Sequence, residues 1–425
     1  MANNGILISG AGIAGPALAY WLRRAGFAVT VVERAPAPRP GGQTVDLRGA
    51  GRTVIERMGL MERARAESVD QRGLALVDAS GRTTARMPAD AFGGEGIVSE
   101  IEILRGDLAR LLYEATLPDT EYLFDDTITG IDQGAAADTV TVTFEKAPPR
   151  RFALVVGADG PHSAVRALAF GPERDLVRPL GLYTAWFTAT EHDWDLDGWY
   201  LMHNAPGGLV ASARPGRLPG EIKAGFSFRS QPIAYDRRDT AAQRELVARR
   251  FAHVGWEVPR LLRAMRTAPD FFLDSMGQVR LDGWSRGRVA LLGDAGYCAT
   301  PLTGLGTSLA LVGAYVLAGE LAAAGGDHTV AFRRYDTVLR PYVTRAQQLP
   351  PGGAGGYAPS SRLGIRLRDL SMRSMTRRPM RNLFAGQFAK AGDIALPEYG
   401  LAAGAGAPPA SFPAGPSKRG QSEGV

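Results

Sequence analysis

The stretch from Ile6 to Glu33 limits most strongly what this chain can fold into. Ile6–Ser9 is a short apolar run, as expected for a strand that is buried on both faces. Gly10–Gly15 follows with the spacing Gly-x-Gly-x-x-Gly, and Pro16–Ala25 has the apolar periodicity of a helix. Ala28–Glu33 is a second β-branched run that ends on an acid. We therefore predict a strand–turn–helix–strand unit belonging to a parallel sheet.

Each glycine of this turn has a physical reason to be there. Gly10 permits a tight turn, Gly12 lets the backbone approach a diphosphate, and Gly15 lets the helix pack closely on the strand. The start of the helix offers free N–H groups to phosphates, and Glu33, 18 residues past Gly15, is placed to accept a ribose hydroxyl. The alternative is a glycine-rich turn without function, in a chain with 53 glycines. The pattern predicts a dinucleotide site but does not choose between NAD, NADP and FAD.

Composition indicates an ordinary globular protein of two or three domains. The chain has 425 residues, of which 45% are hydrophobic and 22% charged. Its formal net charge of +6 comes almost wholly from arginine, which we attribute to a GC-rich genome. We find no continuous block of like charge and no basic helix with interleaved aromatic residues, so we expect no nucleic-acid partner.

Cysteine and histidine usage argues against disulfides and metals. Cys298 is the only cysteine, so no intrachain disulfide can form, and the five histidines lack metal-ligand spacing. The first strand begins too early to leave room for a signal peptide, and Leu305–Ala324 suits a buried core helix better than a membrane span. We expect a cytoplasmic protein without a metal and without a membrane partner.

The order of elements predicts an α/β fold with a second, largely antiparallel part. Three β runs at 121–124, 127–131 and 139–144 suggest a β-meander, and the alternating, aromatic-rich runs between 180 and 230 suggest a separate antiparallel sheet. We predict a discontinuous first domain at 1–72, 98–177 and 275–345, and a second at 73–97 and 178–274. A C-terminal helical segment at 346–395 and a disordered tail at 400–425 complete the chain.

Two further stretches place an acid or a glycine turn at the end of a predicted parallel strand, where open α/β sheets bind ligands. They are Gly157–Arg166, which contains Asp159, and Gly287–Gly306, which contains Gly293-Asp294-Ala295 and ends in Gly304-Leu305-Gly306. With these motifs in this order, the sequence resembles the FAD-dependent monooxygenases typified by para-hydroxybenzoate hydroxylase. The resemblance spans about residues 5 to 345 and is strongest toward the branch of tetracycline-inactivating and antibiotic-tailoring enzymes.

The resemblance implies a Rossmann-like FAD-binding domain, an antiparallel-sheet substrate domain and a set of residues around non-covalently bound FAD. Asp294 resembles the acid on the ribityl chain, Asp159 the acid shared by FAD and NADPH, and Arg105 the FAD-contacting arginine. The full predicted cofactor set is Gly10, Gly12, Ile13, Ala14, Gly15, Glu33, Arg34, Arg39, Asp46, Arg105, Asp159, Gly293, Asp294, Pro301, Gly304, Leu305 and Gly306. Arg39 aligns with an arginine that the drug-inactivating branch directs toward NADPH, and Asp46 with an acid near the flavin ring.

Simpler structural roles stand beside these. Asp159 and Asp294 can be read as helix caps, and Arg105 as a surface ion pair. We name Trp186, Met202 and Phe226 as candidate substrate contacts, although core packing is the more common role for such residues. Gly296-Tyr297 departs from the Ala-His that many family members have, which leaves FAD binding intact but allows a different flavin environment.

The function implied by the resemblance is hydroxylation or oxygenation of an aromatic or polyketide-like molecule. NADPH or NADH would reduce the flavin, and O2 would add to give a C4a-hydroperoxide that transfers oxygen; no catalytic side chain stands out. The alternatives are a FAD-binding, non-redox enzyme of the cyclase type, and a dehydrogenase that does not use O2. The sequence leaves open the substrate and whether the protein is a monomer or a homodimer.

Overall fold

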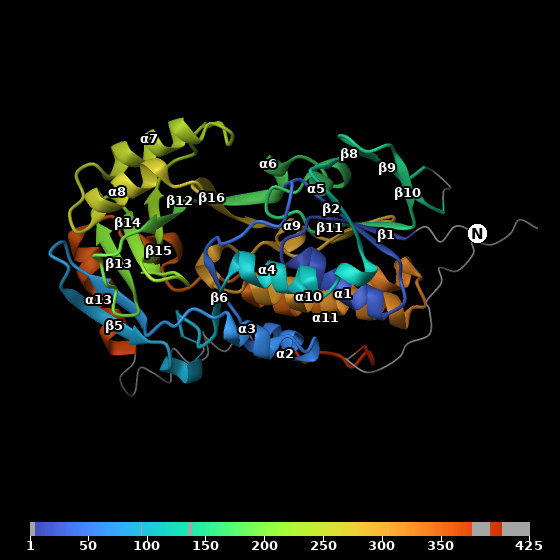
Figure 1. Cartoon of the computed structure of the whole chain (residues 1–425), viewed down its shortest axis with the longest axis horizontal. Helices are drawn as coiled ribbons and strands as arrows, with labels where there is room; N and C mark the ends of the chain where they lie inside the picture. Colours follow the sequence, from blue (N-terminus) through green and yellow to red (C-terminus); the bar gives the residue numbers. More distant parts are fainter. Residues whose placement is uncertain (1–4, 95, 135–137, 376–391, 402–425) are drawn as a thin grey trace, which may run out of the picture.

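The computed structural model describes residues 5–94, 96–134, 138–375 and 392–401, and in it the chain forms two halves, each built on one large sheet (Figure 1). The tail predicted at 400–425 lies outside the described residues from 402 onward. We call the two parts the parallel-sheet half and the seven-stranded half. The strands β12 and β16 reach from the second toward the first.

The parallel-sheet half is a three-layer structure. Its six-stranded sheet has the order β17-β18-β11-β1-β2-β7, in which only β17 is antiparallel to its neighbour. The strands are β1 (Ile6–Ser9), β2 (Val29–Glu33), β7 (Glu121–Phe124), β11 (Leu154–Gly157), β17 (Ser285–Arg286) and β18 (Val289–Leu291). The short antiparallel pair β3 (Thr44–Asp46) and β6 (Glu102–Leu104) lies at the border with the other half.

The two faces of this sheet are covered differently because successive residues of a strand point to opposite sides. Ile6 and Ile8 pack against helices, whereas Leu7 packs against the small sheet β8 (Ile128–Asp132), β9 (Val140–Phe144) and β10 (Arg150–Phe152). The helices of this half are α1 (Ala14–Arg24), α2 (Gly49–Arg57), α3 (Met61–Ala66), α4 (Arg105–Glu114), α5 (Ala164–Ala169), α6 (Glu173–Leu176), α9 (Asp294–Tyr297), α10 (Gly306–Ala323) and α11 (His328–Ala346).

The predicted three-stranded meander exists but with different strands. We expected 121–124 to be its first strand, whereas β7 pairs in parallel with β2 and β10 supplies the third antiparallel strand. The reason is a contact that alternation does not encode: Glu121 accepts a hydrogen bond from Thr30 Oγ1 (2.8 Å) on β2 and pairs with Arg150 (2.8 Å).

The other half contains a sheet of order β16-β12-β15-β14-β13-β4-β5, antiparallel except between β13 and β4. Its strands are β4 (Gly73–Val77), β5 (Thr83–Pro88), β12 (Val177–Thr190), β13 (Trp199–Ala205), β14 (Leu209–Pro215), β15 (Glu221–Arg229) and β16 (Phe272–Val279). Helices α7 (Thr240–Phe251) and α8 (Val258–Thr267) cover one face; α12 (Gly353–Tyr357) and α13 (Arg362–Met375) lie on the other side. The domain boundary predicted at 275 falls inside β16.

α10 is long and apolar enough to cross a membrane by length and composition alone. In the structure it is buried among α1, α2 and α11, which is the position of a core helix. The helix predicted at 305–324 is therefore present with nearly the predicted ends.

A histidine clasp joins the two halves. His162, in the loop between β11 and α5, contacts Glu173 through Nδ1 (2.9 Å) and Asp274 of β16 through Nε2 (3.0 Å). Burial acts to lower the pKa of His162, but the hydrogen bonds to Asp274 and Glu173 outweigh it and raise this pKa to about 9. The imidazolium in turn lowers the pKa of Glu173 to about 2. At neutral pH the clasp is therefore an ion pair.

Because the pKa of His162 is higher in the folded than in the unfolded chain, the clasp stabilises the fold fully below the unfolded value and progressively less as pH rises through 9. We expect His162→Ala to lower the free energy of unfolding by about 2 kcal/mol near pH 6, and by less near pH 10. Urea titrations at the two pH values measure this. His253→Ala, at an exposed histidine, is the control; an equal loss at both pH values for His162→Ala would contradict the assignment.

Candidate functional site

The turn between β1 and α1 has the geometry that the glycine spacing predicts. Gly10 has φ +106°, and an ideal Cβ on Gly15 would lie 1.9 Å from the carbonyl oxygen of Gly10. These two glycines are therefore required for α1 to pack on β1. A Cβ on Gly12 would instead meet only Arg105 Nη2, at 3.3 Å. Gly12 is thus not needed for packing and faces a cation, as expected where an anion approaches the backbone.

The first turn of α1 lacks the usual protein partner. The residue preceding the helix, Ile13, gives it no side-chain cap, and Ile13 and Ala14 are themselves buried. The same holds for α10, which Leu305 precedes without a side-chain cap. Both helices thus begin with N–H groups that no capping side chain satisfies, and the positive ends of their dipoles favour negative charge.

Glu33 lies at the carboxyl end of β2 and is tied to the glycine turn. Its Oε2 accepts a hydrogen bond from the Ala11 N–H (2.8 Å), and its Oε1 accepts one from the Ala35 N–H (2.9 Å). Arg39 lies 3.9 Å from Glu33 with a side chain that is 64% exposed, and Arg34 is exposed too. Glu33 therefore orients the turn, while both arginines remain accessible from solvent.

The third motif meets the first turn in space. An ideal Cβ on Gly293 would lie 3.3 Å from Ala14 Cβ, and one on Gly306 would lie 3.9 Å from Asp294 Oδ1. Burial raises the pKa of Asp294, and the positive charge of Arg105 opposes that shift. The structure thus brings the glycine turn, Arg105 and the Gly-Asp motif to one place, although about 280 residues separate the first from the last.

Both carboxylate oxygens of Asp159 accept hydrogen bonds from neighbouring residues of the chain. Its Oδ1 accepts from Ser163 Oγ (2.5 Å), and its Oδ2 accepts from the N–H groups of Ala164 (2.8 Å) and Val165 (3.2 Å). Both carboxylate oxygens thus hold the start of α5, which is the simpler of the two roles considered for this acid. Asp159 adjoins the first turn because the backbone of residue 158 contacts Gly10.

A buried charge network lies beside the turn at 301–306, which we call the last turn. Of its residues the sequence predicted only Asp46. Arg48 pairs with Asp46 (2.8 Å), and an ideal Cβ on Gly304 would lie 3.4 Å from Asp46 Oδ2. Asp46 faces Glu102 across the β3–β6 pair, and Glu102 pairs with Arg214 of β14. Burial raises the pKa of Glu102 to about 8 against the attraction of Arg214. The network connects the two halves beside Gly304.

Only tertiary contacts reveal the partners of this network. Arg48, Glu102 and Arg214 are ordinary charged residues in sequence, without motif spacing. Lys223 is a further buried charge, paired with Glu221 (2.6 Å) and donating to Thr188 Oγ1 (2.9 Å). A sequence signal for it existed, because a lysine between apolar residues of a predicted strand is uncommon in a chain with four lysines.

The three candidate substrate residues lie on different faces of the seven-stranded sheet. Trp186 and Met202 belong to the apolar cluster on the side of α12 and α13, and Leu302 from the last turn packs against the same cluster. Phe226 lies in the cluster under α7 and α8, with Phe251 at 4.6 Å between ring centroids, and is fully buried. Its predicted substrate contact is therefore wrong: the pleat directs it to the opposite face.

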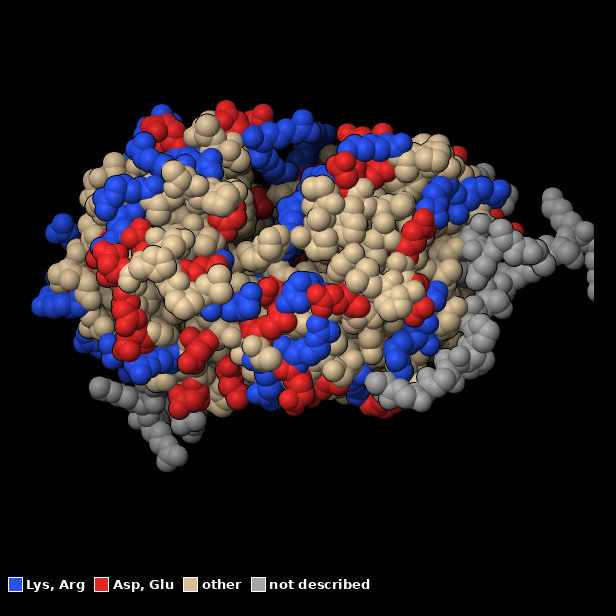
Figure 2. Space-filling model, in the orientation of Figure 1, with Lys and Arg blue, Asp and Glu red and all other residues tan. Residues whose placement is uncertain are grey.

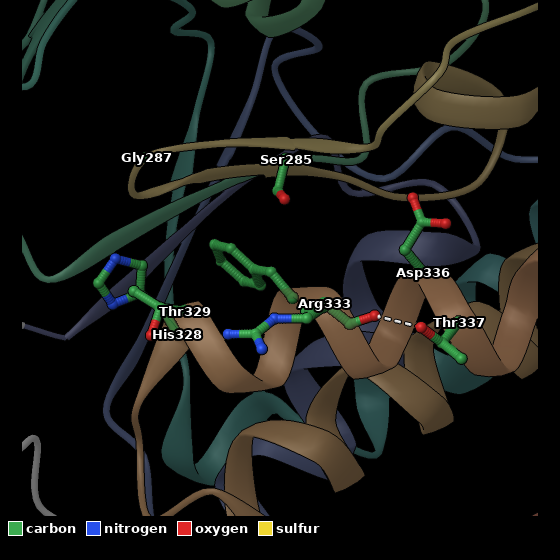
Figure 3. A pocket seen from close by; sticks show the side chains of 8 residues that line it. Ser285, Gly287, His328, Thr329, Arg333, Asp336 and Thr337 are labelled. Carbon is green, nitrogen blue, oxygen red and sulfur yellow. Dashed lines mark hydrogen bonds between the residues drawn. The ribbon is translucent and has the colours of Figure 1, made fainter.

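Figure 2 shows the molecular surface hollowed between the two halves, with Lys and Arg side chains at its border. A separate depression lies between the turn at Ser285–Gly287 and α11 (Figure 3). It is lined by His328, Phe332, Arg333 and other residues of α11, and Thr337 Oγ1 donates to the carbonyl oxygen of Arg333 there (2.9 Å). None of the predicted cofactor residues borders this depression, so we place the site at the glycine turns.

Comparison with known proteins shows the family of this chain. Residues 4–346 match the family described as FAD binding domain. An uncharacterized protein of Mycobacterium tuberculosis is 47% identical over 355 residues, which is 83% of this chain and 94% of that protein. A flavin-dependent monooxygenase of Legionella longbeachae is 40% identical over 344 residues, which is 81% of this chain and 87% of that protein.

Solved structures with the same fold include the tetracycline destructase Tet(55), 36% identical with a TM-score of 0.77 over 93% of this chain and 99% of that one. HpxO of Klebsiella pneumoniae, complexed with FAD and uric acid, has a TM-score of 0.71 over 92% of this chain and 98% of that one. At 22% identity the second likeness concerns the fold alone.

The different surroundings of Gly12 and Gly15 give a matched pair of variants. We expect Gly12→Ala to lower FAD affinity about ten- to a hundredfold, because the new methyl group occupies the approach to the backbone. The thermal stability of the FAD-free protein should stay unchanged, since only the end of a flexible arginine is near. Gly15→Ala should lower that stability itself. Flavin titration and thermal unfolding measure the two effects; normal FAD affinity of Gly12→Ala would contradict the placement.

The residues present suit FAD. The start of α1, which has no side-chain cap, would suit the diphosphate, and Gly12 leaves the backbone open there beside Arg105. The start of α10, which also has no side-chain cap, would suit the electron-rich edge of the flavin. Asp294 supplies a half-buried carboxylate between these two helix starts. With the match over residues 4–346 and relatives at 40–47% identity, the chain belongs to the FAD-binding domain family and, within it, to the flavin-dependent monooxygenases.

Proposed function

We propose that this enzyme uses NADPH or NADH and O2 to hydroxylate or oxygenate an aromatic or polyketide-like small molecule in the cytoplasm. The observation that carries the proposal is the meeting of the last turn, where Leu302 lies, with the cluster of Trp186 and Met202. FAD, when bound, supplies the redox chemistry and the activation of oxygen. The protein supplies position, charge and exclusion of water.

The residues that we propose for FAD binding have charges that suit different parts of FAD. The guanidinium of Arg105 beside Gly12 suits the diphosphate, and Asp294 suits a ribityl hydroxyl. The start of α10, where the dipole is positive, favours the negative charge that a reduced flavin carries. Arg105 and the start of α10 would thus face negatively charged parts of FAD, and Asp294 would accept a hydrogen bond from a neutral hydroxyl.

The sheet face beside the last turn combines apolar surface with fixed polar groups, as small-molecule sites do. Arg214 lies over the Tyr200 ring, 4.5 Å from its centroid, and burial raises the pKa of Tyr200, which keeps the phenol neutral. Tyr357 of α12 meets Ser227 through its hydroxyl (3.1 Å) and closes this face on one side. A flat ring system bearing oxygen atoms fits such a mixture.

The names of the relatives support the same substrate class. Tetracycline destructases Tet(51) and Tet(55) are 34% and 36% identical, and each is covered to 99% by this chain. Tetracyclines are polycyclic molecules with enol and ketone groups, which matches the predicted polyketide-like substrate. The substrate of this enzyme would share that chemistry.

The decisive experiment follows NAD(P)H loss, O2 uptake and product mass in one reaction. We expect a yellow protein whose NAD(P)H oxidation rises at least about tenfold with substrate, with one atom of isotopically labelled O2 in the product. Turnover that continues without O2 would indicate a dehydrogenase. Product formed without NAD(P)H would indicate a non-redox, cyclase-type use of FAD, and a protein that binds no FAD would overturn the proposal altogether.

A variant of Arg39 tests whether this residue contacts the nicotinamide co-substrate. We expect Arg39→Ala to raise the KM for NADPH about tenfold, because a charge-assisted contact to phosphate is lost, while FAD content stays the same. Arg72→Ala removes an arginine of similar exposure (60% against 64%) that pairs with Asp197 instead, and it should leave the KM unchanged. Steady-state kinetics of both variants measure the KM for NADPH. Equal KM values in Arg39→Ala and wild type would rule out this contact.

A further inference from the structure

Helix α13 carries three leucines that the fold leaves in solvent. Leu363, Leu367 and Leu370 are 66%, 57% and 61% exposed. Their spacing of four and three residues puts them on one stripe of the helix. Exposed leucines are ordinary when single, but three together on one helix face indicate an interaction surface.

The opposite side of α13 is anchored, so this stripe cannot turn inward. Arg368 Nη2 donates to Asn204 Oδ1 (2.7 Å), and Asp369 accepts from Thr84 Oγ1 (2.7 Å). Met372 is buried in the cluster that also contains Met202. Contacts to two strands, β13 and β5, thereby fix the rotation of the helix about its axis.

The surface around the stripe is strongly basic. Arg362 and Arg366 are exposed beside the leucines and make no ion pair with any residue that the structure describes. In sequence, 362–381 contains seven arginines and one acid, so its net charge of +6 equals that of the whole chain. Within α13 no two arginines are adjacent in sequence, so this helix contains no continuous block of like charge.

A second copy of this chain is a poor occupant of the surface. A two-fold contact between two α13 helices would place the same arginine-lined stripe opposite itself. The only acid of α13, Asp369, is turned to Thr84 and paired with Arg368 (3.0 Å), so it offers no compensating charge. Leucines framed by cations suit a partner that is apolar inside and negative at its surface.

We propose that α13 is a peripheral membrane-binding helix that lays Leu363, Leu367 and Leu370 into the surface of an anionic bilayer. Its arginines would contact lipid phosphates, while the enzyme stays on one side of the membrane. This inference is independent of the proposed reaction, because it concerns where the enzyme sits and not what it oxidises.

Vesicle flotation of the full-length, FAD-loaded enzyme tests the proposal without turnover. We expect binding to vesicles that contain phosphatidylglycerol, little binding to pure phosphatidylcholine, and release by salt at about 1 M, where screening is nearly complete. The double variants Leu363→Ser/Leu367→Ser and Arg362→Gln/Arg366→Gln should each weaken binding roughly tenfold. Flavin content should stay at the wild-type level, since all four side chains face solvent.

Leu218→Ser is the matched control, because Leu218 is 60% exposed outside α13, and it should bind like the wild type. Failure of the wild type to float with phosphatidylglycerol vesicles would overturn the proposal, as would unchanged binding of the double leucine variant. Analytical ultracentrifugation supplies a further check. A dimer that Leu363→Ser/Leu367→Ser converts to a monomer would assign the stripe to self-association instead.

Discussion

The close contact of α1 with β1 is the constraint on which the rest of the molecule depends. Gly15 has no room for a Cβ because the carbonyl oxygen of Gly10 occupies that position. This contact aims the start of α1 at the strand ends, where α9 and α10 also begin. A Cβ on Gly15 would push the helix away from the strand, and a Cβ on Gly10 would meet the carbonyl oxygen of Ala158 at 2.6 Å.

Charged side chains surround the contact between α1 and β1. Arg105 lies beside Gly12 and lowers the cost of keeping Asp294 ionised, and Glu33 holds the turn through the Ala11 N–H. The site thus combines the cation of Arg105 with helix N-termini, an arrangement that suits a ligand with a negatively charged centre. Specificity for the flavin end would come from the last turn, where Gly304 leaves space beside Asp46.

The border between the halves is held by two polar connections of different character. The clasp of His162 with Asp274 and Glu173 is partly exposed, whereas the pair of Glu102 with Arg214 is deeply buried. Since a buried pair is costly to separate, the second connection is the stronger constraint on how the sheet face sits over the last turn. Both connections join a residue of the parallel-sheet half to a residue of the seven-stranded half.

The sequence by itself determined the glycine turns, the acids at the strand ends and the two-sheet organisation, because these follow from local spacing and periodicity. It did not determine that Phe226 faces α7 and α8, or that β7 joins the parallel sheet. Nor did it indicate Glu102 and Arg214, which are 112 positions apart. The physical reason is common to these cases: strand pairing and side-chain direction depend on partners that are distant in sequence.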